Sequence, residues 1–455
     1  MKRLPLSLLA HWAGGELQGD DAIIAGITQD TRALQPGSMY VALRGERFDG
    51  HDFAYDAAMR GASALLVEHA VNVDLPQIIV GDSQLALARI ATGIHQEQGG
   101  KVVAITGSNG KTSVKTLIVS ILQRAGVTYF NPGNRNNEIG VPLAVIDAPD
   151  DADFSVYEMG AGQPGDIAYL TDIVPPDVAL VNNVAAAHLE RMGSLLGVAE
   201  TKGAIYDALP AAGTAVINAD DAFAEYFAEK VADRRILRYG LESSADITAR
   251  GIQADADGSR FTLVTPQGEI AVELHLPGRH NVLNALAAAS LALACDVSLR
   301  MIAEGLAAAQ PVAGRQIART LGNGAVLIDD SYNANPGSLA AAIDTLAAGD
   351  GEAWLVLGDM RELGPEAISL HADAGRRALA AGIKRLYTLG PLSQAASTAF
   401  GEGARHFETH KILADALRAD LHAGVRCLVK GSRGSAMDKI VTALLSEGEG
   451  KSHVA

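Results

Sequence analysis

Hydrophobic and polar positions along the chain follow two repeating patterns, short β-branched apolar runs and longer apolar stripes with helical spacing. The apolar run over residues 102–105 is followed by a glycine-punctuated loop, and apolar residues then recur at i, i+3, i+4 and i+7 from Val114 to Ala125. This order predicts a buried strand, a loop and a helix that begins near Lys111 and stops at Gly126.

The last third of the chain repeats this alternation. It predicts strands over residues 325–328, 353–357, 385–389 and 425–429, with helices from Pro336 and over residues 366–380, which together indicate a doubly wound sheet. Between Asp246 and Pro277 the runs are shorter and are separated by Asp257-Gly258 and Gln267-Gly268, a pattern that favours antiparallel hairpins.

Two polar or glycine-containing breaks divide the chain, one over residues 96–100 and one over residues 310–314. A chain of 455 residues is too long for one ordinary core, and about three domains are expected. We predict an α/β protein with three domains: a smaller mixed α/β domain (1–98), a central parallel-sheet domain with a small antiparallel portion (99–312) and a Rossmann-like domain (313–455).

The charge balance limits the partners. The net charge of −16 disfavours general binding to nucleic acid, so an anionic ligand must be held by local basic residues and helix ends.

The apolar stretch over residues 4–10 is short and is interpreted as a first helix, and the alanine-rich stretch over 283–293 as a buried helix, so no membrane insertion is expected. Cys295 and Cys427, far apart, fit a reducing compartment and exclude a disulfide framework, which indicates a cytoplasmic protein.

The loop after the first strand of the middle part predicts a nucleoside triphosphate site. At a helix start, unpaired backbone N–H groups and the helix dipole favour a phosphate, a lysine adds positive charge, and a threonine hydroxyl can face Mg²⁺. The usual motif has one more glycine where this chain has Ile105, so the loop is a shortened form. Its residues are Gly107, Ser108, Asn109, Gly110, Lys111 and Thr112.

Two further side chains follow apolar strands of the same part. Glu158 follows the run 154–157, and His188 lies beyond the run 178–181. Because the carboxyl ends of parallel strands share one edge, we expect both near Thr112, in a magnesium site. The alternatives are a carboxylate that caps the turn after Glu158 and a histidine that bonds a loop carbonyl. Asn182 and Asn183 are interpreted as turn formers.

The order and spacing of seven segments resemble the Mur ligases of peptidoglycan synthesis, and most closely the branch that adds a dipeptide. The most telling are Asp329-Asp330-Ser331-Tyr332-Asn333-Ala334-Asn335-Pro336 and Leu357-Gly358-Asp359-Met360-Arg361-Glu362-Leu363-Gly364. The others cover residues 106–112, 133–142, 187–190, 276–285 and 430–434. The shortened phosphate loop is the form that this family uses.

The resemblance implies an ATP- and Mg²⁺-dependent amide ligase that acts through an acyl phosphate in cytoplasmic peptidoglycan precursor synthesis. The central domain would bind ATP, the N-terminal domain UDP-N-acetylmuramoyl-tripeptide, and the C-terminal domain would close with D-alanyl-D-alanine. We expect a monomer with these small-molecule substrates and no nucleic acid partner.

The same resemblance assigns the catalytic residues. Lys111 and the loop amides would contact the phosphates, Thr112 and Glu158 a first magnesium ion, and His188 a second. Lys202 matches a lysine that several members carry as a carbamate, which turns a cation into an oxygen ligand. Its alternative is an exposed helical lysine.

Other residues are expected to contact substrates. Asn281 would face adenine, and Arg315 and Asp330 would reach the nucleotide. The alternatives are a helix cap for Asn281, a surface arginine for Arg315 and a turn aspartate for Asp330. The remaining candidates are Thr31 and Arg32 for the uridine nucleotide, Asn134 and Asn137 for the muramoyl peptide, and Lys430 and Arg433 for a carboxylate or phosphate. The alternatives are a solvated loop arginine for Arg32, a turn for the two asparagines and a basic helix start for Lys430 and Arg433.

Two other protein classes remain open. A different ligase of the superfamily, such as a single-amino-acid-adding Mur ligase or a folylpolyglutamate synthase, would share the loop, Glu158 and Lys202. The two signatures spelled out above favour the dipeptide-adding branch instead. A switch or motor NTPase would need the longer phosphate loop, and a GTPase an Asn-Lys-x-Asp motif that the sequence lacks.

Overall fold

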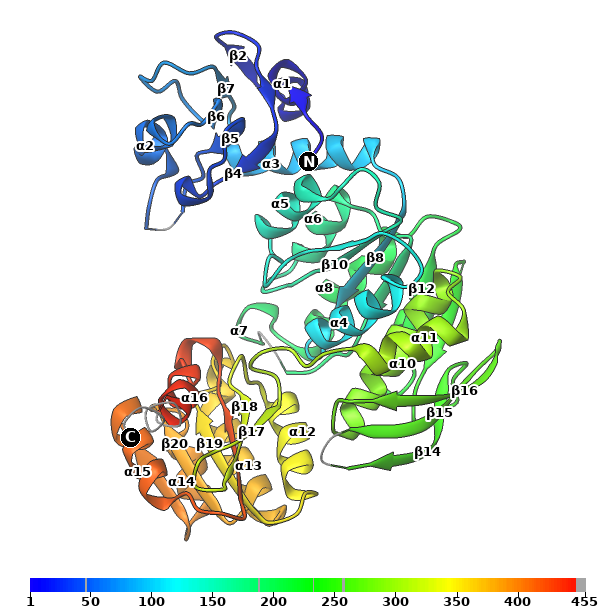
Figure 1. Ribbon diagram of the computed structural model, residues 1–455, viewed down its shortest axis with the longest axis vertical. Coiled ribbons are helices and arrows are strands. Elements are labelled where there is room, and N and C mark those ends of the chain that lie inside the picture. The colour runs from blue at the N-terminus through cyan, green and yellow to red at the C-terminus, as the bar shows by residue number, and fades with distance from the viewer. Residues whose placement is uncertain (46, 187–188, 232, 256–257, 447–455) are drawn as a thin grey trace, which may run out of the picture.

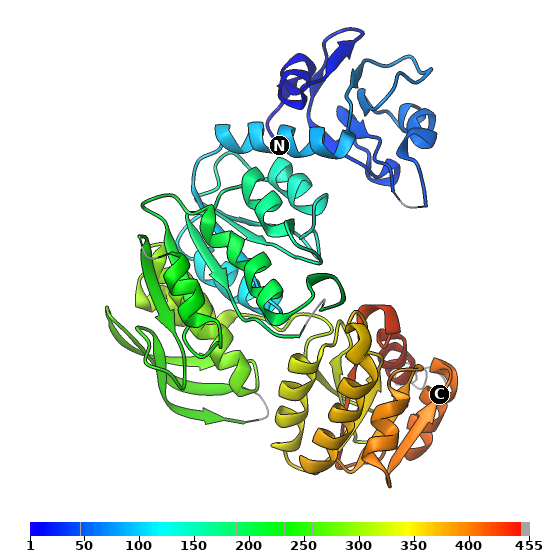
Figure 2. The same ribbon diagram turned by 180° about the vertical axis from the view of Figure 1, so that it is seen from behind.

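The computed structural model describes residues 1–45, 47–186, 189–231, 233–255 and 258–446. The N-terminal, central and C-terminal domains follow one another along the long axis of the molecule (Figures 1 and 2). The predicted class, a three-domain α/β protein with parallel central and C-terminal sheets, is confirmed.

The N-terminal domain is mixed α/β, as predicted. Its five-stranded sheet, in the order β2-β7-β6-β5-β4, is parallel except for β2. The elements are β1 Leu4–Pro5, α1 Leu6–Ala13, β2 Glu16–Gln18, β3 Ile23–Ile24, β4 Gly26–Thr28, η1 Thr31–Ala33, β5 Ser38–Val41, η2 Gly50–Phe53, α2 Ala54–Met59, β6 Ala64–Val67, β7 Gln77–Ile79 and α3 Ser83–Glu97.

The central domain contains a parallel six-stranded sheet in the order β13-β12-β11-β8-β10-β9, which places β8 between β11 and β10. The strands are β8 Lys101–Thr106, β9 Thr128–Phe130, β10 Phe154–Glu158, β11 Val178–Val181, β12 Thr214–Asn218 and β13 Arg235–Tyr239. The helices are α4 Lys111–Leu122, α5 Gly140–Asp147, α6 Asp166–Ile173, α7 Leu189–Met192, α8 Leu195–Asp207, α9 Ala224–Lys230, α10 Arg279–Ala294 and α11 Leu299–Ala308.

Alternating residues of β8 explain why both faces of this sheet are covered. Val103 and Ile105 pack in a core with α4 and α10, whereas Val102 and Ala104 pack in another core with α5, α6 and α8. The predicted antiparallel portion is β14 Thr248–Ala254, β15 Ser259–Thr265 and β16 Gly268–Leu274.

The C-terminal domain has the order β17-β18-β22-β19-β20-β21, and all neighbouring strands are parallel except β17 with β18. Its strands are β17 Ile317–Thr320, β18 Val326–Asp330, β19 Glu352–Gly358, β20 Arg385–Leu389, β21 Ala404–Phe407 and β22 Val425–Lys430. Its helices are α12 Pro336–Ala347, η3 Gly364–Glu366, α13 Ala367–Ala380, α14 Gln394–Phe400, α15 His410–Asp420, η4 Arg433–Ser435 and α16 Asp438–Leu445.

Several predicted boundaries differ from the structure, and two helix ends show the reason. Helix α4 ends at Leu122, because the chain continues in turn-like bonds, with the amides of Ala125 and Gly126 both donating to the Leu122 carbonyl. Helix α1 begins at Leu6, because Leu4 pairs with Ile24 in a short antiparallel bridge.

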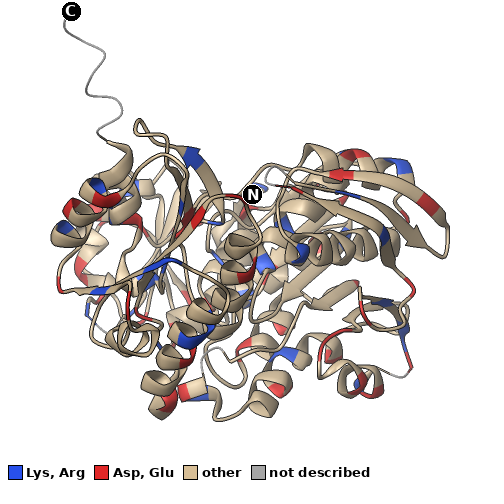
Figure 3. Ribbon diagram, turned by 90° about the horizontal axis from the view of Figure 1, so that it is seen from below, with Lys and Arg blue, Asp and Glu red and all other residues tan. Residues whose placement is uncertain are grey.

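Charge is spread over the molecule. Acidic and basic residues are interspersed over the helices and strands of the view in Figure 3, in keeping with a net charge of −16 that comes from many sites. Over the described ranges, every helix is too short or too polar to cross a lipid bilayer.

Candidate active site

A cleft of about 1010 Å³ lies at the carboxyl edge of the central sheet and extends to the C-terminal domain. Four segments contribute most of its wall: the phosphate loop, the end of β10, the start of α10, and the loop between β18 and α12. This placement agrees with the rule that ligands of open parallel sheets bind beyond the carboxyl ends of the strands.

Glycine is required in the phosphate loop for two reasons. Gly107 and Gly110 have φ of 146° and 78°, values that favour glycine. A Cβ atom on Gly110 would also lie 2.5 Å from Asn182 Nδ2 and 2.6 Å from Asn284 Oδ1. The strand, tight loop and helix predicted from the sequence are all present here.

Two asparagines that follow β11 hold this loop. Asn182 Nδ2 donates to the Asn109 carbonyl over 3.0 Å, and the Asn109 amide donates to Asn183 Oδ1 over 2.8 Å. Their interpretation as simple turn formers is therefore incomplete. The available signal was their place at the end of a strand that neighbours β8.

The Lys111 side chain curls back onto its own loop. Its Nζ donates to the Gly107 carbonyl over 2.6 Å. Burial lowers the pKa of Lys111, the Arg315 charge lowers it further, and Glu158 opposes the shift. A polyphosphate would offer this ammonium a stronger, charged partner than a carbonyl.

Glu158 lies at the end of β10 among polar partners. Thr112 Oγ1 donates to Glu158 Oε2 over 2.9 Å, Asn136 Nδ2 donates to Oε1 over 2.9 Å, and Lys115 forms a 3.3 Å ion pair. Burial raises the pKa of Glu158, but Lys115 and Lys111 outweigh it and the net shift is downward. The carboxylate is therefore ionised at neutral pH. The turn-capping alternative is not observed, because Asp166 accepts from the amides of that turn.

The pair Thr112 and Glu158 fits a magnesium ion. Hydroxyl and carboxylate oxygens are the ligands that Mg²⁺ prefers, and it usually keeps several waters. Over the described residues, no group of three His, Cys, Asp or Glu side chains gathers as a metal cluster, so Thr112 and Glu158 alone would leave room for water and phosphate oxygens as further ligands. His188, expected at a second ion, lies outside the described residues.

Lys202 is buried in α8, with 1% of its surface exposed, so the alternative of an exposed helical lysine is wrong. Burial, helped by the Lys111 charge and opposed by Asp166, lowers the pKa of Lys202 to about 7. A substantial fraction of this amine is therefore neutral at neutral pH. Only a neutral amine can add to carbon dioxide, so the environment suits the expected carbamate.

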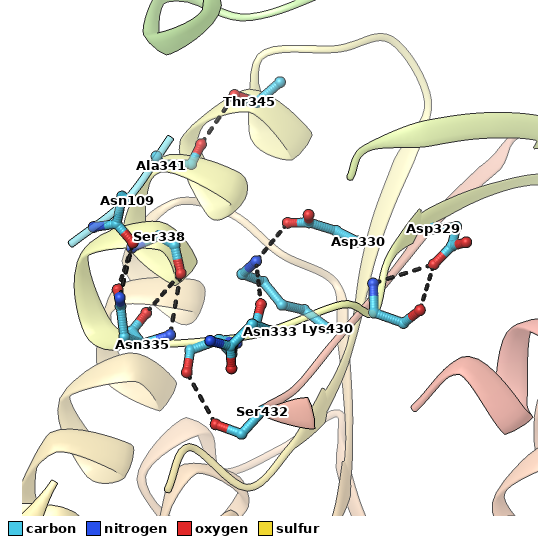
Figure 4. Close-up of polar contacts among 12 residues, drawn as sticks. Asn109, Asp329, Asp330, Asn333, Asn335, Ser338, Ala341, Thr345, Lys430 and Ser432 are labelled. Atoms are coloured by element: carbon cyan, nitrogen blue, oxygen red, sulfur yellow. Dashed lines mark hydrogen bonds and ion pairs between the residues drawn. The ribbon is translucent and has the colours of Figure 1, made fainter. Parts of the chain in front are cut away.

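Two side chains of the C-terminal domain reach the phosphate loop. Arg315 Nη2 donates to Thr112 Oγ1 over 2.9 Å, and its guanidinium lies 4.6 Å from the centre of the Tyr332 ring. Asn335 Nδ2 donates to Asn109 Oδ1 over 2.8 Å, and Asn335 Oδ1 caps helix α12 (Figure 4). The sequence placed Asn335 in a motif without assigning it a contact.

Asp330 and Lys430 form a buried ion pair at the ends of neighbouring strands β18 and β22, with 2.7 Å between Oδ2 and Nζ (Figure 4). Burial raises the pKa of Asp330, against the opposing charges of Lys430 and Arg315. Both side chains of the pair line the cleft. The alternatives of a turn aspartate and a basic helix start are thereby excluded for this pair, because Asp330 ends β18 and Lys430 ends β22.

Asn281 also lines the cleft, as expected, but it does not cap helix α10. The helix is capped at Gly278, and Asn281 Nδ2 donates to the Pro277 carbonyl over 2.7 Å from inside the first turn. Next to it, burial lowers the pKa of His280 to about 4, with a contribution from Lys430, so this ring is neutral.

The remaining expected substrate residues divide between cleft and surface. Asn137 lines the cleft, and its Oδ1 accepts from the Gly140 amide. Asn134 and Arg433 are exposed outside it. Thr31 and Arg32 lie in the N-terminal domain, where Arg32 pairs with Asp30 and 83% of its side chain is exposed. The structure does not bring these four residues to the phosphate loop.

Comparisons with known proteins decide the family. The sequence matches models described as "Mur ligase family, catalytic domain" over residues 23–104, "Mur ligase middle domain" over 105–292 and "Mur ligase, glutamate ligase domain" over 315–433. It is 44% identical over 451 residues to the UDP-N-acetylmuramoyl-tripeptide–D-alanyl-D-alanine ligase of Escherichia coli strain K12, with 98% of this chain and 100% of that protein covered. The chain belongs to the Mur ligase family.

Solved structures of Mur ligases show the same architecture. A crystal structure of MurF from Acinetobacter baumannii matches with a TM-score of 0.93 at 32% identity and covers 98% of this chain and 99% of that chain. MurF from Thermotoga maritima in complex with ADP matches with a TM-score of 0.84 at 28% identity and covers 94% and 98%. The predicted enzyme class, an ATP-dependent ligase that forms C–N bonds with ATP and Mg²⁺, is confirmed for this Mur ligase.

Proposed function

We propose that this Mur ligase joins D-alanyl-D-alanine to UDP-N-acetylmuramoyl-tripeptide, with ATP converted to ADP and phosphate, during peptidoglycan precursor synthesis. The main support is the 44% sequence identity between this chain and the Escherichia coli relative along its full length, because the name of that relative states this activity. The cleft supports it independently, because a phosphate loop and cationic residues of a second domain share one space.

The chemistry requires an activated carboxyl group. A carboxylate is a poor acyl donor, so an oxygen of the tripeptide carboxylate attacks the γ-phosphorus of ATP, and the bond to the ADP oxygen breaks. The dipeptide amine then attacks the carbonyl of the acyl phosphate, loses a proton and expels phosphate. Phosphoryl transfer needs mainly alignment and charge neutralisation from the protein.

The roles proposed for the site residues are those that the family resemblance implies, and the contacts of Lys111 and Arg315 support them. Lys111 and the loop amides bind the phosphates, and Arg315 adds charge from the C-terminal domain. Thr112 and Glu158 would hold a magnesium ion, which would supply neutralising charge to the phosphate oxygens. Lys202 as a carbamate, with His188, would provide further metal ligands, as the family resemblance implies.

The contacts outside the phosphate loop are also proposed from their positions. Asn281 and Asp330 contact the nucleoside, and Asn137 and Lys430 contact the muramoyl peptide or the dipeptide from the cleft wall. Thr31, Arg32, Asn134 and Arg433 would meet substrate only when the domains close around it. We further propose domain boundaries after residues 98 and 312, since α3 ends at Glu97, α11 ends at Ala308 and β17 begins at Ile317. A monomer in the cytoplasm suits these small substrates.

Mass spectrometry of the product tests the proposal directly. Incubation of the protein with ATP, Mg²⁺, UDP-N-acetylmuramoyl-tripeptide and D-alanyl-D-alanine should give one new species, with the summed mass of acceptor and dipeptide minus one water. A product of this kind with single glutamate or another single amino acid, and none with the dipeptide, would identify a different branch of the superfamily.

A further inference from the structure

We infer that Lys115 is a positioning residue for the ligation, which fixes Glu158 and the loop over residues 131–137 relative to the phosphate-loop helix without contacting a substrate. The inference rests on the proposed function, because Asn137 of that loop is proposed to contact the muramoyl peptide or the dipeptide. Lys115 lies one turn after Lys111 on α4, and the sequence pattern gave it no role.

The Lys115 ammonium has a partner for each of its three protons. Its Nζ lies 3.1 Å from the Asn131 carbonyl, 3.2 Å from the Gly133 carbonyl and 3.3 Å from Glu158 Oε2. Its side chain is 6% exposed and that of Glu158 is 4% exposed. One buried cation therefore connects α4, the loop after β9 and the end of β10.

Hydrogen bonds from two asparagine side chains also hold the same loop to Glu158. Asn131 exchanges hydrogen bonds with the Glu158 backbone, donating to its carbonyl and accepting from its amide, each over 2.9 Å. Asn136 Nδ2 holds the other carboxylate oxygen, Oε1, over 2.9 Å. Lys115 and Asn136 thus hold opposite oxygens of one carboxylate and fix its orientation.

Lys115 acts through these neighbours because it does not line the cleft. Glu158, Asn136 and Asn137 line the cleft, whereas Lys115 lines a separate cavity of about 250 Å³ with Phe130 and Gln310. A buried ion pair is also a poor source of stability, since apolar residues of similar volume often replace one without loss. The arrangement is therefore better explained by the geometry that it imposes on the site.

Kinetic and binding measurements on Lys115→Met test the inference. Methionine is unbranched and keeps most of the length of the side chain, but it removes the charge and the three donors. We expect the turnover with both substrates to fall about 100-fold, as for a displacement of about 1 Å in a reacting group, and the KM for the acceptor to rise. The affinity for ADP, measured by calorimetry without Mg²⁺, should change less than about 3-fold, because Lys111 and the loop remain in place.

Lys115→Arg keeps the charge and should recover more than one tenth of the wild-type turnover. Lys101→Met is the matched control, because Lys101 pairs with Asp296 at the opposite end of β8 and should leave both parameters unchanged. If Lys115→Met does not fold, Lys115→Gln is measured in the same way.

A purely structural role would lower only the folded fraction, so that KM and turnover per folded molecule would equal the wild-type values, and this result would overturn the inference. The wild-type protein serves as the reference for the reaction itself. If it fails to ligate the dipeptide, the proposed function is at fault, whereas a normal wild-type reaction with an equally active Lys115→Met variant refutes only the role of Lys115.

Discussion

Replacing Lys111 by alanine is expected to lower kcat/KM for ATP about 100- to 1000-fold, while the protein remains folded. The ammonium is the charged group of the phosphate loop, and removing one preorganised charge or donor from a developing anion costs about 3–4 kcal/mol in related sites. Among the described residues, the Lys111 ammonium donates to its own loop carbonyl at 2.6 Å, and Glu158 keeps Thr112 and Lys115 as partners when Lys111 is removed.

Steady-state phosphate release and the thermal midpoint of unfolding check this expectation together. Lys439→Ala, at an exposed lysine of α16, is the control for loss of a positive charge and should behave as wild type. Near-normal turnover of Lys111→Ala, with a normal thermal midpoint of unfolding, would contradict the proposal that this loop binds the phosphates of ATP.

Replacing Lys202 by alanine is expected to reduce turnover about 100-fold or more, and added formate or acetate should restore part of the loss. A carbamate on Lys202 would supply an oxygen ligand, which a small carboxylate in the space left by alanine can replace. The buried amine, whose pKa is lowered to about 7, has the neutral fraction that carbamate formation needs.

The rescue is the decisive part of this prediction. Turnover should rise with carboxylate concentration in Lys202→Ala and stay unchanged in the wild type. Lys230→Ala, at a partly buried lysine that pairs with Asp207, should show neither loss nor rescue. Full activity of Lys202→Ala without any added acid would contradict the carbamate.

Much of the fold could be predicted because periodicity marks its elements directly. The β20 strand was predicted with the observed bounds, and α12 begins at the predicted Pro336, where Asn335 provides the cap. The boundaries that failed, such as the end of α4, depend on which hydrogen bonds the chain makes after the last apolar residue. Spacing of side chains does not show those bonds.

The site was predictable only where strand order alone brings residues together. The ends of β8 and β10 are adjacent in a parallel sheet, so Thr112 and Glu158 could be placed side by side. By contrast, asparagine is common in turns, and the position of Asn182 at the end of a strand was the only sequence signal that it supports the loop. Lys115 falls in an ordinary helical position, and its partners appear only once the loop after β9 folds back.

Phosphate release measured with substrates omitted in turn tests the central claim, that this cleft couples ATP cleavage to amide bond formation. With UDP-N-acetylmuramoyl-tripeptide, ATP and Mg²⁺, continuous release should require D-alanyl-D-alanine and should fall to background when single amino acids replace it. Release at the same rate without acceptor or dipeptide would show an uncoupled nucleotide hydrolase and would contradict the account.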